Sequence, residues 1–379
     1  MTRKAPSTPP HSDPQSKDPV KLWRRLSGPA TLKHVALVEK LKAHYVTTTR
    51  DDDLAQKIDL MIRDSMVRRD LSRPEGADNR GEGNAIAIIA PSGAGKTKAM
   101  QHFLKDNPYF PNYRDPKGGC PLITIQTRAP ATLGQLGLAT LRACGYQTKS
   151  HLPENEAWAL ARFQMQHQNI LVPHYEEAQR IIKQKNRLER SKIVETFAGL
   201  MTDLDWPLNP IISGLRELRK LFDDDFLDEP TPEARESHAT LTRRTRFVEF
   251  LPIDPKHDRK DLDRGLGEYE KLAGVSLKVA KDTEMRARIC HGAARQFGLF
   301  FELTVGAIDV CVLSGRKDVT LQDYADAYAA RTLQPIELNV FESDYWQDID
   351  TTVIQHRPKA DDEEDETRPK KSKPGRSDP

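Results

Sequence analysis

Five short apolar runs interrupt the chain, and longer stretches with helical spacing separate them. The runs lie at 85–89, 121–125, 170–172, 210–213 and 246–250. Such runs are typical of strands that are buried on both faces of a parallel sheet. Between them, leucines recur every two to three positions through Leu133–Ala143, as expected of a helix with an apolar face. Strands that alternate with helices predict an α/β fold, a parallel five-stranded sheet in a three-layer arrangement.

The segments on either side of the predicted sheet are helical in pattern. Apolar stripes run through Leu32–Arg68, and a polar, glycine-containing loop at 69–84 follows them. From Asp261 to Leu333 no strand pattern occurs, and spacings such as Val305, Ile308 and Val312 dominate. The sequence therefore predicts an N-terminal helical segment at 31–84, an α/β domain at 85–252 and an all-helical lid at 253–335.

Both ends of the chain have the composition of unfolded tails. Residues 1–30 are rich in proline and basic side chains, which predicts a disordered basic arm or an interaction arm. Residues 336–379 include a block of acids followed by a block of bases, a pattern typical of disordered tails. Within that region, the aromatic residues of Phe341–Trp346 suit either of two roles: a peptide that docks on a partner, or a strap that folds back on the lid.

Composition narrows the class of protein. The 379 residues are 37% hydrophobic and 30% charged, enough for a core of one large or two modest domains. A formal net charge of +2 does not by itself demand a nucleic-acid partner. The four cysteines lie far apart, which argues against a disulfide framework or a zinc site. No apolar stretch is long enough for a membrane span and no secretory signal is visible, so we expect a soluble cytoplasmic protein.

The first predicted strand leads into a phosphate-binding loop. The segment reads Ala90, Pro91, Ser92, Gly93, Ala94, Gly95, Lys96 and Thr97. A helical pattern follows it, which is the context a P-loop requires. The glycines let backbone N–H groups turn toward phosphate oxygens, and the helix directs its positive end at the same anion. We expect ATP there, with Lys96 on the β- and γ-phosphates and Thr97 offering its hydroxyl to Mg²⁺.

An acidic pair follows the third predicted strand. We assign Glu176 to the metal and Glu177 to the general base that orients the attacking water. Such sites usually have aspartate at the metal position, and Pro173 is an unusual residue for a central strand. The alternative is that both carboxylates simply begin a helix over Ala178–Arg190, where the helix dipole favours acids.

Two further positions suit nucleotide hydrolysis. Ser213 ends the fourth strand, where P-loop ATPases with an additional strand carry a polar sensor of the γ-phosphate; a plain turn is the alternative. Arg243, Arg244 and Arg246 stand just before the last strand, where one of them could act as an arginine finger toward a neighbouring subunit. The alternative for these arginines is a set of surface salt bridges.

Taken in order, APSGAGKT, HYEEAQ, PIISGLRELRKLF and RRTRF, with a helical lid behind them, resemble the TniB/TnsC family of AAA+ transposition ATPases over roughly Leu32–Leu333. The resemblance implies an ATPase that oligomerises as a ring or helical filament on double-stranded DNA and links a target selector to a transposase, and a nucleoid-associated location. The lid segment Gly298–Leu303 departs from many AAA+ proteins, because it has no arginine for the γ-phosphate. Slow, regulatory hydrolysis would fit Glu176 at the aspartate position.

Basic side chains near the second and third strands are the candidates for DNA phosphate contacts. They are Arg128, Lys149, Arg180, Lys183, Lys185, Arg187, Arg190 and Lys192. Contacts of this kind carry no sequence choice, which suits a protein whose target is chosen by a partner. The second candidate function is a nucleotide-switched signalling or chaperone-like AAA+ protein without a DNA role. A small-molecule kinase is disfavoured, because it would leave the helical region after 261 unexplained.

Overall fold

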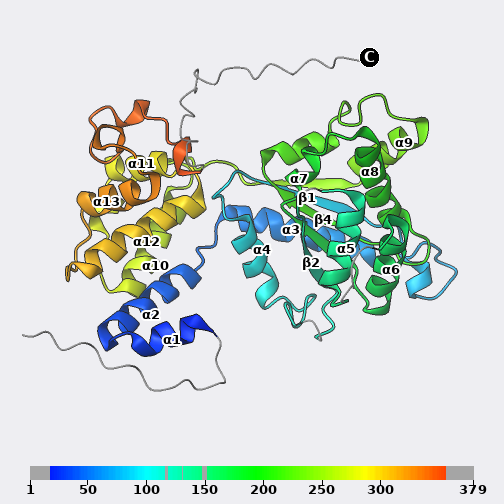
Figure 1. Ribbon diagram of the computed structural model, residues 1–379, viewed down its shortest axis with the longest axis horizontal. Helices are drawn as coiled ribbons and strands as arrows, with labels where there is room; N and C mark the ends of the chain where they lie inside the picture. Colours follow the sequence, from blue (N-terminus) through cyan, green and yellow to red (C-terminus); the bar gives the residue numbers. More distant parts are fainter. Residues whose placement is uncertain (1–17, 116–117, 130, 147–151, 356–379) are drawn as a thin grey trace, which may run out of the picture.

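The structure, a computed structural model, describes residues 18–115, 118–129, 131–146 and 152–355 and folds into two lobes (Figure 1). The sheet lobe contains strands β1 (Ala85–Ile89), β2 (Leu122–Gln126), β3 (Val172–Glu176), β4 (Ile211–Gly214) and β5 (Thr245–Glu249). Its helices are α3 (Thr49–Ser65), α4 (Lys96–Lys105), α5 (Leu133–Ala143), α6 (Glu154–His167), α7 (Gln179–Ile182), α8 (Arg187–Thr202) and α9 (Pro232–Arg243). The other lobe contains α1 (Pro19–Leu26), α2 (Pro29–Ala43), α10 (Arg259–Ala273), α11 (Thr283–Gly292), α12 (Phe297–Leu313) and α13 (Leu321–Thr332).

The five strands form one parallel sheet in the order β2-β3-β4-β1-β5. Strand β4 is therefore inserted between β1, which precedes the P-loop, and β3, which carries the acidic pair. Ser213 of β4 is in register with Ile88 of β1, and Glu176 of β3 with Gln126 of β2. Because all strands run the same way, their carboxyl ends meet at one edge of the sheet, the edge at which such folds bind ligands.

Helices cover both faces of the sheet, and successive residues of each strand pack into different cores. On β1, Ala85, Ala87 and Ile89 face the core made with α5, α6, α8 and α9. Ile86 and Ile88 face the core made with α3 and α4. The predicted α/β fold with a parallel five-stranded, three-layer sheet is thus confirmed.

Strand β3 differs from the expected strand at 170–172. It runs from Val172 to Glu176, straight through Pro173, and its polar residues are accommodated inside the sheet. Pro173 faces Ile123 of β2, and pairing with β4 begins one residue later at His174. The missing N–H therefore falls before the first β3–β4 partner pair, which explains how a proline fits a central strand.

The helix expected over 178–190 is interrupted. Two helices, α7 and α8, take its place, and Asn186 starts the second by accepting a hydrogen bond from the Leu188 N–H at 3.0 Å. An asparagine side chain at this position satisfies a backbone donor that the first turn of a helix leaves free. The acidic pair consequently precedes α7 without being part of a helix, and Glu177 has a left-handed backbone with φ of 57°.

The helical segment expected over 32–68, with its two apolar stripes, forms two helices that belong to different lobes. Helix α3 packs on the sheet, whereas α2 packs on the lid, beneath α10 and α12 in Figure 1. His34 of α2 contacts Asp309 of α12 at 2.7 Å, and His44, the residue after α2, contacts Glu268 of α10 at 2.9 Å. The connection at 44–48 therefore crosses between the lobes.

Part of the arm expected at 1–30 is helical. Helix α1 begins after Asp18, whose side chain accepts from the Val20 N–H at 3.0 Å, and Arg24 pairs with Glu39 of α2. Trp23 is 62% exposed on this helix. Residues 1–17 lie outside the described residues.

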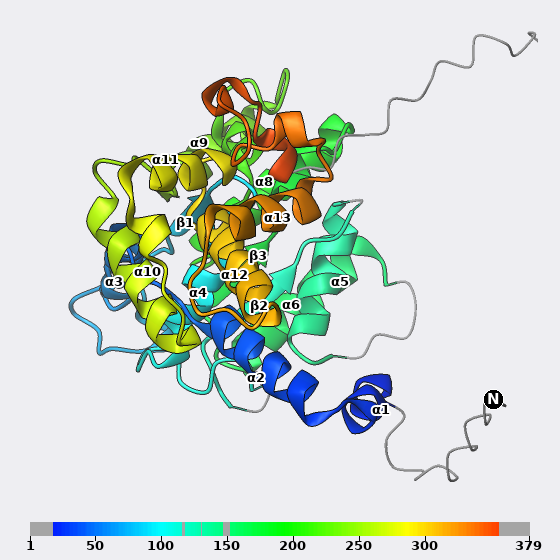
Figure 2. The same cartoon turned by 90° about the vertical axis from the view of Figure 1, so that its left-hand side faces the viewer.

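The lid extends beyond residue 335 and includes the aromatic segment. Phe341 and Trp346 are buried in the lid core, as the strap alternative would have it, while Tyr345 is exposed. Phe341 packs on Tyr324 of α13, with ring centroids 5.6 Å apart. Figure 2 shows this red segment folded beside α11 and α13. The acidic and basic blocks lie at 361–376, outside the described residues.

Cutting the chain after Leu338 is expected to destabilise the lid severely. Loss of a single buried Phe or Trp side chain costs about 3–5 kcal/mol, and this cut removes both Phe341 and Trp346. It also removes the carbonyls of Val340 and Ser343, each of which accepts from Arg288 at 3.0 Å. Thermal unfolding measures the effect, and a cut after Gln355, which keeps every described residue, is the control. A protein cut at 338 that melts like the control would contradict the strap.

In the described part of the chain, no single helix is long and apolar enough to span a bilayer; the bent pair α11 and α12 meets that test only when its two helices are counted together.

Candidate nucleotide-binding site

The predicted P-loop lies at the carboxyl end of β1 and leads directly into α4. Gly93 and Gly95 have φ of 78° and 95°, the left-handed region that glycine adopts without strain. Gly95 is the N-cap of α4 and contributes no side-chain cap, so the first N–H groups of that helix point free into the loop. A Cβ at Gly95 would meet open space. The loop is therefore an anion cradle with backbone donors and room above them.

Lys96 lies over this cradle. Its Nζ donates to the carbonyl oxygens of Ala90 at 3.1 Å and Pro91 at 3.5 Å, which hold the ammonium at the loop. Burial lowers the pKa of Lys96, and the nearby carboxylates of Glu177, Glu176 and Glu217 oppose that shift. The lysine is thus surrounded by negative charge on one side and by carbonyl oxygens on the other.

Thr97 and Glu176 come together from α4 and β3. Burial and the charge of Glu177 raise the pKa of Glu176, and the nearby Thr97 hydroxyl opposes that rise. Arg114 and Lys96 oppose this rise. A hydroxyl and a carboxylate are the oxygen donors that Mg²⁺ takes when it keeps several waters and binds substrate phosphates. Among the described residues no group of three or more His, Cys, Asp or Glu side chains that could hold a metal ion gathers.

The Glu177 carboxylate lies near Lys96 and is held from the other side. The side-chain amide of Gln179 donates to the Glu177 carboxylate through Nε2 at 2.9 Å. Its oxygen, Oε1, accepts from the Leu215 N–H at 3.1 Å. The two predicted acids therefore occupy different surroundings: one contacts the P-loop threonine, the other a buried amide. That difference is compatible with the separate roles of metal ligand and base.

Ser213 lies between the P-loop strand and the acidic strand, and its hydroxyl is engaged. It contacts Nε2 of His174 at 2.9 Å, and both side chains are buried. Burial lowers the pKa of His174 to about 4, so this imidazole is neutral near pH 7. Nδ1 of His174 has no hydrogen-bond partner in the described structure. The sequence analysis did not mark His174, because a lone histidine in a strand carries no pattern.

The three predicted finger arginines lie at the opposite edge of the sheet from the P-loop. The Arg244 carbonyl accepts from the N–H of Ala85, the first residue of β1. Arg244 pairs with Glu82 and Arg246 with Asp64, as the salt-bridge alternative proposes for these two. Arg243 is exposed and has no partner among the described side chains. None of the three arginines therefore lies at the P-loop of its own chain.

A cavity of about 630 Å³ opens where the two lobes meet beside the P-loop. Ala94 and Gly95 form one wall, and Arg50, Phe297 and Gly298 belong to the others. The Arg50 guanidinium stacks over the Phe297 ring at 3.8 Å, and burial lowers the pKa of Arg50 to about 10. An apolar cavity with a few polar groups, adjoining an anion cradle, is suited to the base and sugar of a nucleotide.

The lid rests directly on the P-loop. The N–H of Leu299, at the start of α12, donates to the Gly93 carbonyl at 3.1 Å. A Cβ at Gly298 would lie 2.3 Å from that same oxygen, so this close approach requires glycine. The lid segment Gly298–Leu303, which has no arginine, therefore contacts the P-loop through its backbone.

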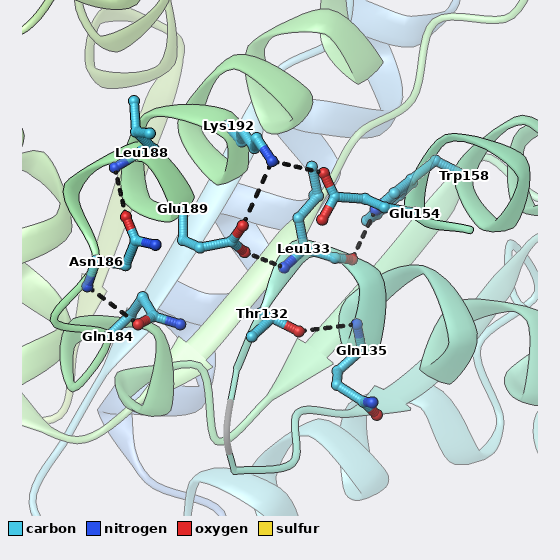
Figure 3. Close-up of polar contacts among 10 residues, drawn as sticks. All are labelled: Thr132, Leu133, Gln135, Glu154, Trp158, Gln184, Asn186, Leu188, Glu189 and Lys192. Carbon is cyan, nitrogen blue, oxygen red and sulfur yellow. Dashed lines mark hydrogen bonds and ion pairs between the residues drawn. The ribbon is translucent and has the colours of Figure 1, made fainter. Parts of the chain in front are cut away.

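Four of the eight basic residues proposed for DNA contact other groups of the protein. Arg180 donates to the Thr127 carbonyl, Arg190 to the Phe226 carbonyl, and Arg187 pairs with Asp228 and Glu229. Figure 3 shows Lys192 between Glu154 and Glu189, with Glu189 also accepting from the Leu133 N–H at 3.0 Å at the start of α5. Arg128, Lys183 and Lys185 are exposed and have no partner in the ranges that the structure describes. Lys149 lies outside those ranges.

Arg50, Arg114 and Glu217 belong to the site, although sequence analysis did not find them. Arg50 follows Thr48 and Thr49, residues that signal a helix start but no chemistry. Arg114 lies in a loop with no motif, and Glu217 lies in the 3₁₀ helix Arg216–Phe222. Arg50 lines the cavity, and Arg114 and Glu217 lie close enough to Glu176 and Lys96, respectively, to affect the pKa values of those residues.

The chain matches no protein-family model and no curated protein. Among solved structures it is similar to Cdc6p from Pyrobaculum aerophilum, with 13% identity over 75% of this chain and 68% of that chain and a TM-score of 0.48. It is also similar to the ORC1 protein of Aeropyrum pernix in complex with DNA, at 11% identity, 77% and 69% coverage and a TM-score of 0.47. It is similar as well to Drosophila ORC bound to DNA, with 14% identity over 88% of this chain and 72% of that chain and a TM-score of 0.48.

The strand order and the connections carry the fold assignment on their own. An extra strand stands between the P-loop strand and the acidic strand, the P-loop opens α4, and an all-helical lid follows the sheet. The chain has the fold of a AAA+ ATPase: a P-loop α/β domain of the additional-strand type with a helical lid.

Proposed function

We propose that this protein hydrolyses ATP and regulates DNA transposition, oligomerising on double-stranded DNA as a ring or filament and linking a target selector to a transposase. The observation that carries the ATPase part is the cluster of Lys96, Thr97, Glu176 and Glu177 at one edge of the sheet. The transposition part rests on the resemblance of the four sequence segments to the TniB/TnsC family.

In the proposed reaction each group of the cluster has one task. Lys96 exchanges its contacts with the Ala90 and Pro91 carbonyls for the β- and γ-phosphate oxygens. Thr97 and Glu176 would hold Mg²⁺, which would supply positive charge that offsets the charge of the phosphates. Glu177 takes a proton from the water whose oxygen attacks the γ-phosphorus, while the bond from that phosphorus to the β–γ bridging oxygen breaks. The products are ADP and inorganic phosphate.

Glu177→Gln is expected to keep ATP binding and to slow hydrolysis by roughly 10²–10⁴, the usual contribution of a positioned base. The amide has the shape of the carboxylate but cannot accept the proton. Steady-state phosphate release measures the rate, and DNA-bound assemblies should persist with ATP. If Glu176→Gln produces this behaviour and Glu177→Gln does not, the two roles are reversed.

DNA binding in the presence of ATP should weaken steeply with salt. We propose Arg128, Lys183 and Lys185 as phosphate contacts, supported by their exposure and by the bond from Arg180 to Thr127, which holds their two loops together. Replacing any one of them with alanine should lower the slope of log K against log salt by about 1. Lys271→Ala, an exposed lysine of the lid, is the matched control. Absence of ATP-dependent DNA binding would favour the signalling or chaperone-like alternative.

A further inference from the structure

We propose that Gln179 is a positioning residue: it orients the Glu177 carboxylate and couples it to the residues that directly follow β4, the proposed γ-phosphate sensor strand. The inference rests on the proposed role of Glu177 as the base. It concerns the regulation of that same site: whether the base is in place depends on the state of β4.

The side-chain amide of Gln179 is buried, and both its nitrogen and its oxygen form hydrogen bonds. Gln179 is 5% exposed, its Nε2 donates to Oε2 of Glu177 at 2.9 Å, and its Oε1 accepts from the Leu215 N–H at 3.1 Å. Leu215 follows β4 and is two residues beyond Ser213. One planar amide therefore joins the proposed base to the end of the proposed sensor strand.

The backbone leaves this amide little freedom. A Cβ at Gly214 would lie 2.7 Å from Oε1 of Gln179 and 3.0 Å from its backbone nitrogen, so β4 passes directly against the glutamine and a larger residue at 214 would displace its amide. The Ala178 N–H donates to the Ser213 carbonyl at 2.9 Å, a second link between the end of β4 and the segment that follows β3. A shift of 213–215 must consequently move Gln179 as well.

Glu177 itself needs such support. Its left-handed backbone, with φ of 57°, is uncommon for a residue with a side chain and persists where its surroundings hold it. The carboxylate has no packing of its own in a helix, because α7 begins two residues later. The hydrogen bond from Gln179 fixes one of its oxygens, Oε2, and the carboxylate lies close enough to Lys96 to oppose the lowering of the Lys96 pKa.

This geometry supplies a route from nucleotide to base. A γ-phosphate read by Ser213 at the end of β4 acts on the segment 213–215, and the Leu215–Gln179–Glu177 chain passes the movement to the carboxylate. After phosphate leaves, Leu215, Gln179 and Glu177 return to their earlier positions. Hydrolysis would thus be timed by the sensor strand, which suits slow, regulatory turnover.

Two substitutions separate positioning from simple support. Gln179→Glu keeps an oxygen that accepts from Leu215 but has no N–H to donate to Glu177. Gln179→Leu loses both contacts. We expect Gln179→Glu, which sets a second buried carboxylate beside that of Glu177, to melt below the parent protein but still to bind ATP, and to lower kcat by about 10–100-fold, the range for lost outer contacts in active sites. Gln179→Leu should lower both kcat and the melting temperature.

The measurements are thermal unfolding, binding of ATP and steady-state phosphate release at saturating DNA. Gln184→Leu, whose amide contacts only the Asn186 N–H, is the matched control for a glutamine lost from the same segment. In a Glu177→Gln background, Gln179→Glu should cause no further loss, because Gln179 acts through Glu177. Parent-like kcat in Gln179→Glu, or a full additional loss in the double variant, would overturn the inference. Normal hydrolysis by Glu177→Gln alone would instead overturn the proposed function.

Discussion

Lys96→Ala is expected to abolish productive ATP binding. Three carboxylates, those of Glu177, Glu176 and Glu217, lie close enough to Lys96 to affect its pKa. Without the ammonium they face the β- and γ-phosphates directly, so the variant loses a charge-assisted contact and leaves like charges opposed. A hydrogen bond to a charged group contributes about 1.5–3 kcal/mol, which corresponds to a loss of affinity of roughly 10–150-fold.

Titration with a fluorescent ATP analogue measures this loss. Lys105→Ala is the matched control, because Lys105 is an exposed lysine in the last turn of the same helix, α4. Its affinity should equal that of the parent. Nucleotide affinity of Lys96→Ala within a factor of about two of the parent would refute the P-loop assignment, since this lysine is the fixed phosphate contact of such loops.

The sheet could be predicted because parallel strands that are buried on both faces consist of continuous runs of apolar residues. Residues 85–89 show this fully: all five are buried and all belong to β1. The third strand was misplaced because it contains Pro173, His174 and Glu176, which no apolar pattern includes. His174 is tolerated there only through its contact with Ser213, a residue 39 positions away. Pairing of that kind is decided by tertiary structure.

Helical periodicity predicts an apolar face but not which neighbour covers it. The stripes at 32–68 indicated helices correctly, yet nothing in them assigns α2 to the lid and α3 to the sheet. The same limit applies to the aromatic segment after 340, for which docking on a partner and packing on the lid demand identical residues. In each case the missing information is the surface that the rest of the chain presents.

The residues predicted from the P-loop and the acidic pair lie together in space: Lys96, Thr97, Glu176 and Glu177. Motifs of this type can be recognised because one local backbone geometry needs those residues in that order. Gln179 also belongs to the quoted HYEEAQ segment, but its contact with Leu215 depends on how β4 packs. Arg50, Arg114 and Glu217 have no local requirement of this kind.

Arg243→Ala is expected to lose ATPase activity while still binding nucleotide. Arg243 is the exposed arginine of the three, whereas Arg244 and Arg246 pair with acids of their own chain. It lies at the end of α9, away from its own P-loop, where only a neighbouring subunit could use it. An arginine finger supplied in this way accounts for about 10³–10⁵ in rate, so the loss should be of that size.

Mixing variants tests whether Arg243 acts between subunits. Arg243→Ala retains a working P-loop, and Lys96→Ala retains the arginine, so a mixed assembly should contain junctions with both and regain part of the turnover. Phosphate release at varied mixing ratios, with ATP and DNA present, measures the recovery. Arg244→Ala and Arg246→Ala serve as controls that disturb only ion pairs within one chain, and should keep most of the activity. No recovery in the mixture, together with monomeric behaviour under ATP and DNA, would exclude an intersubunit finger at Arg243.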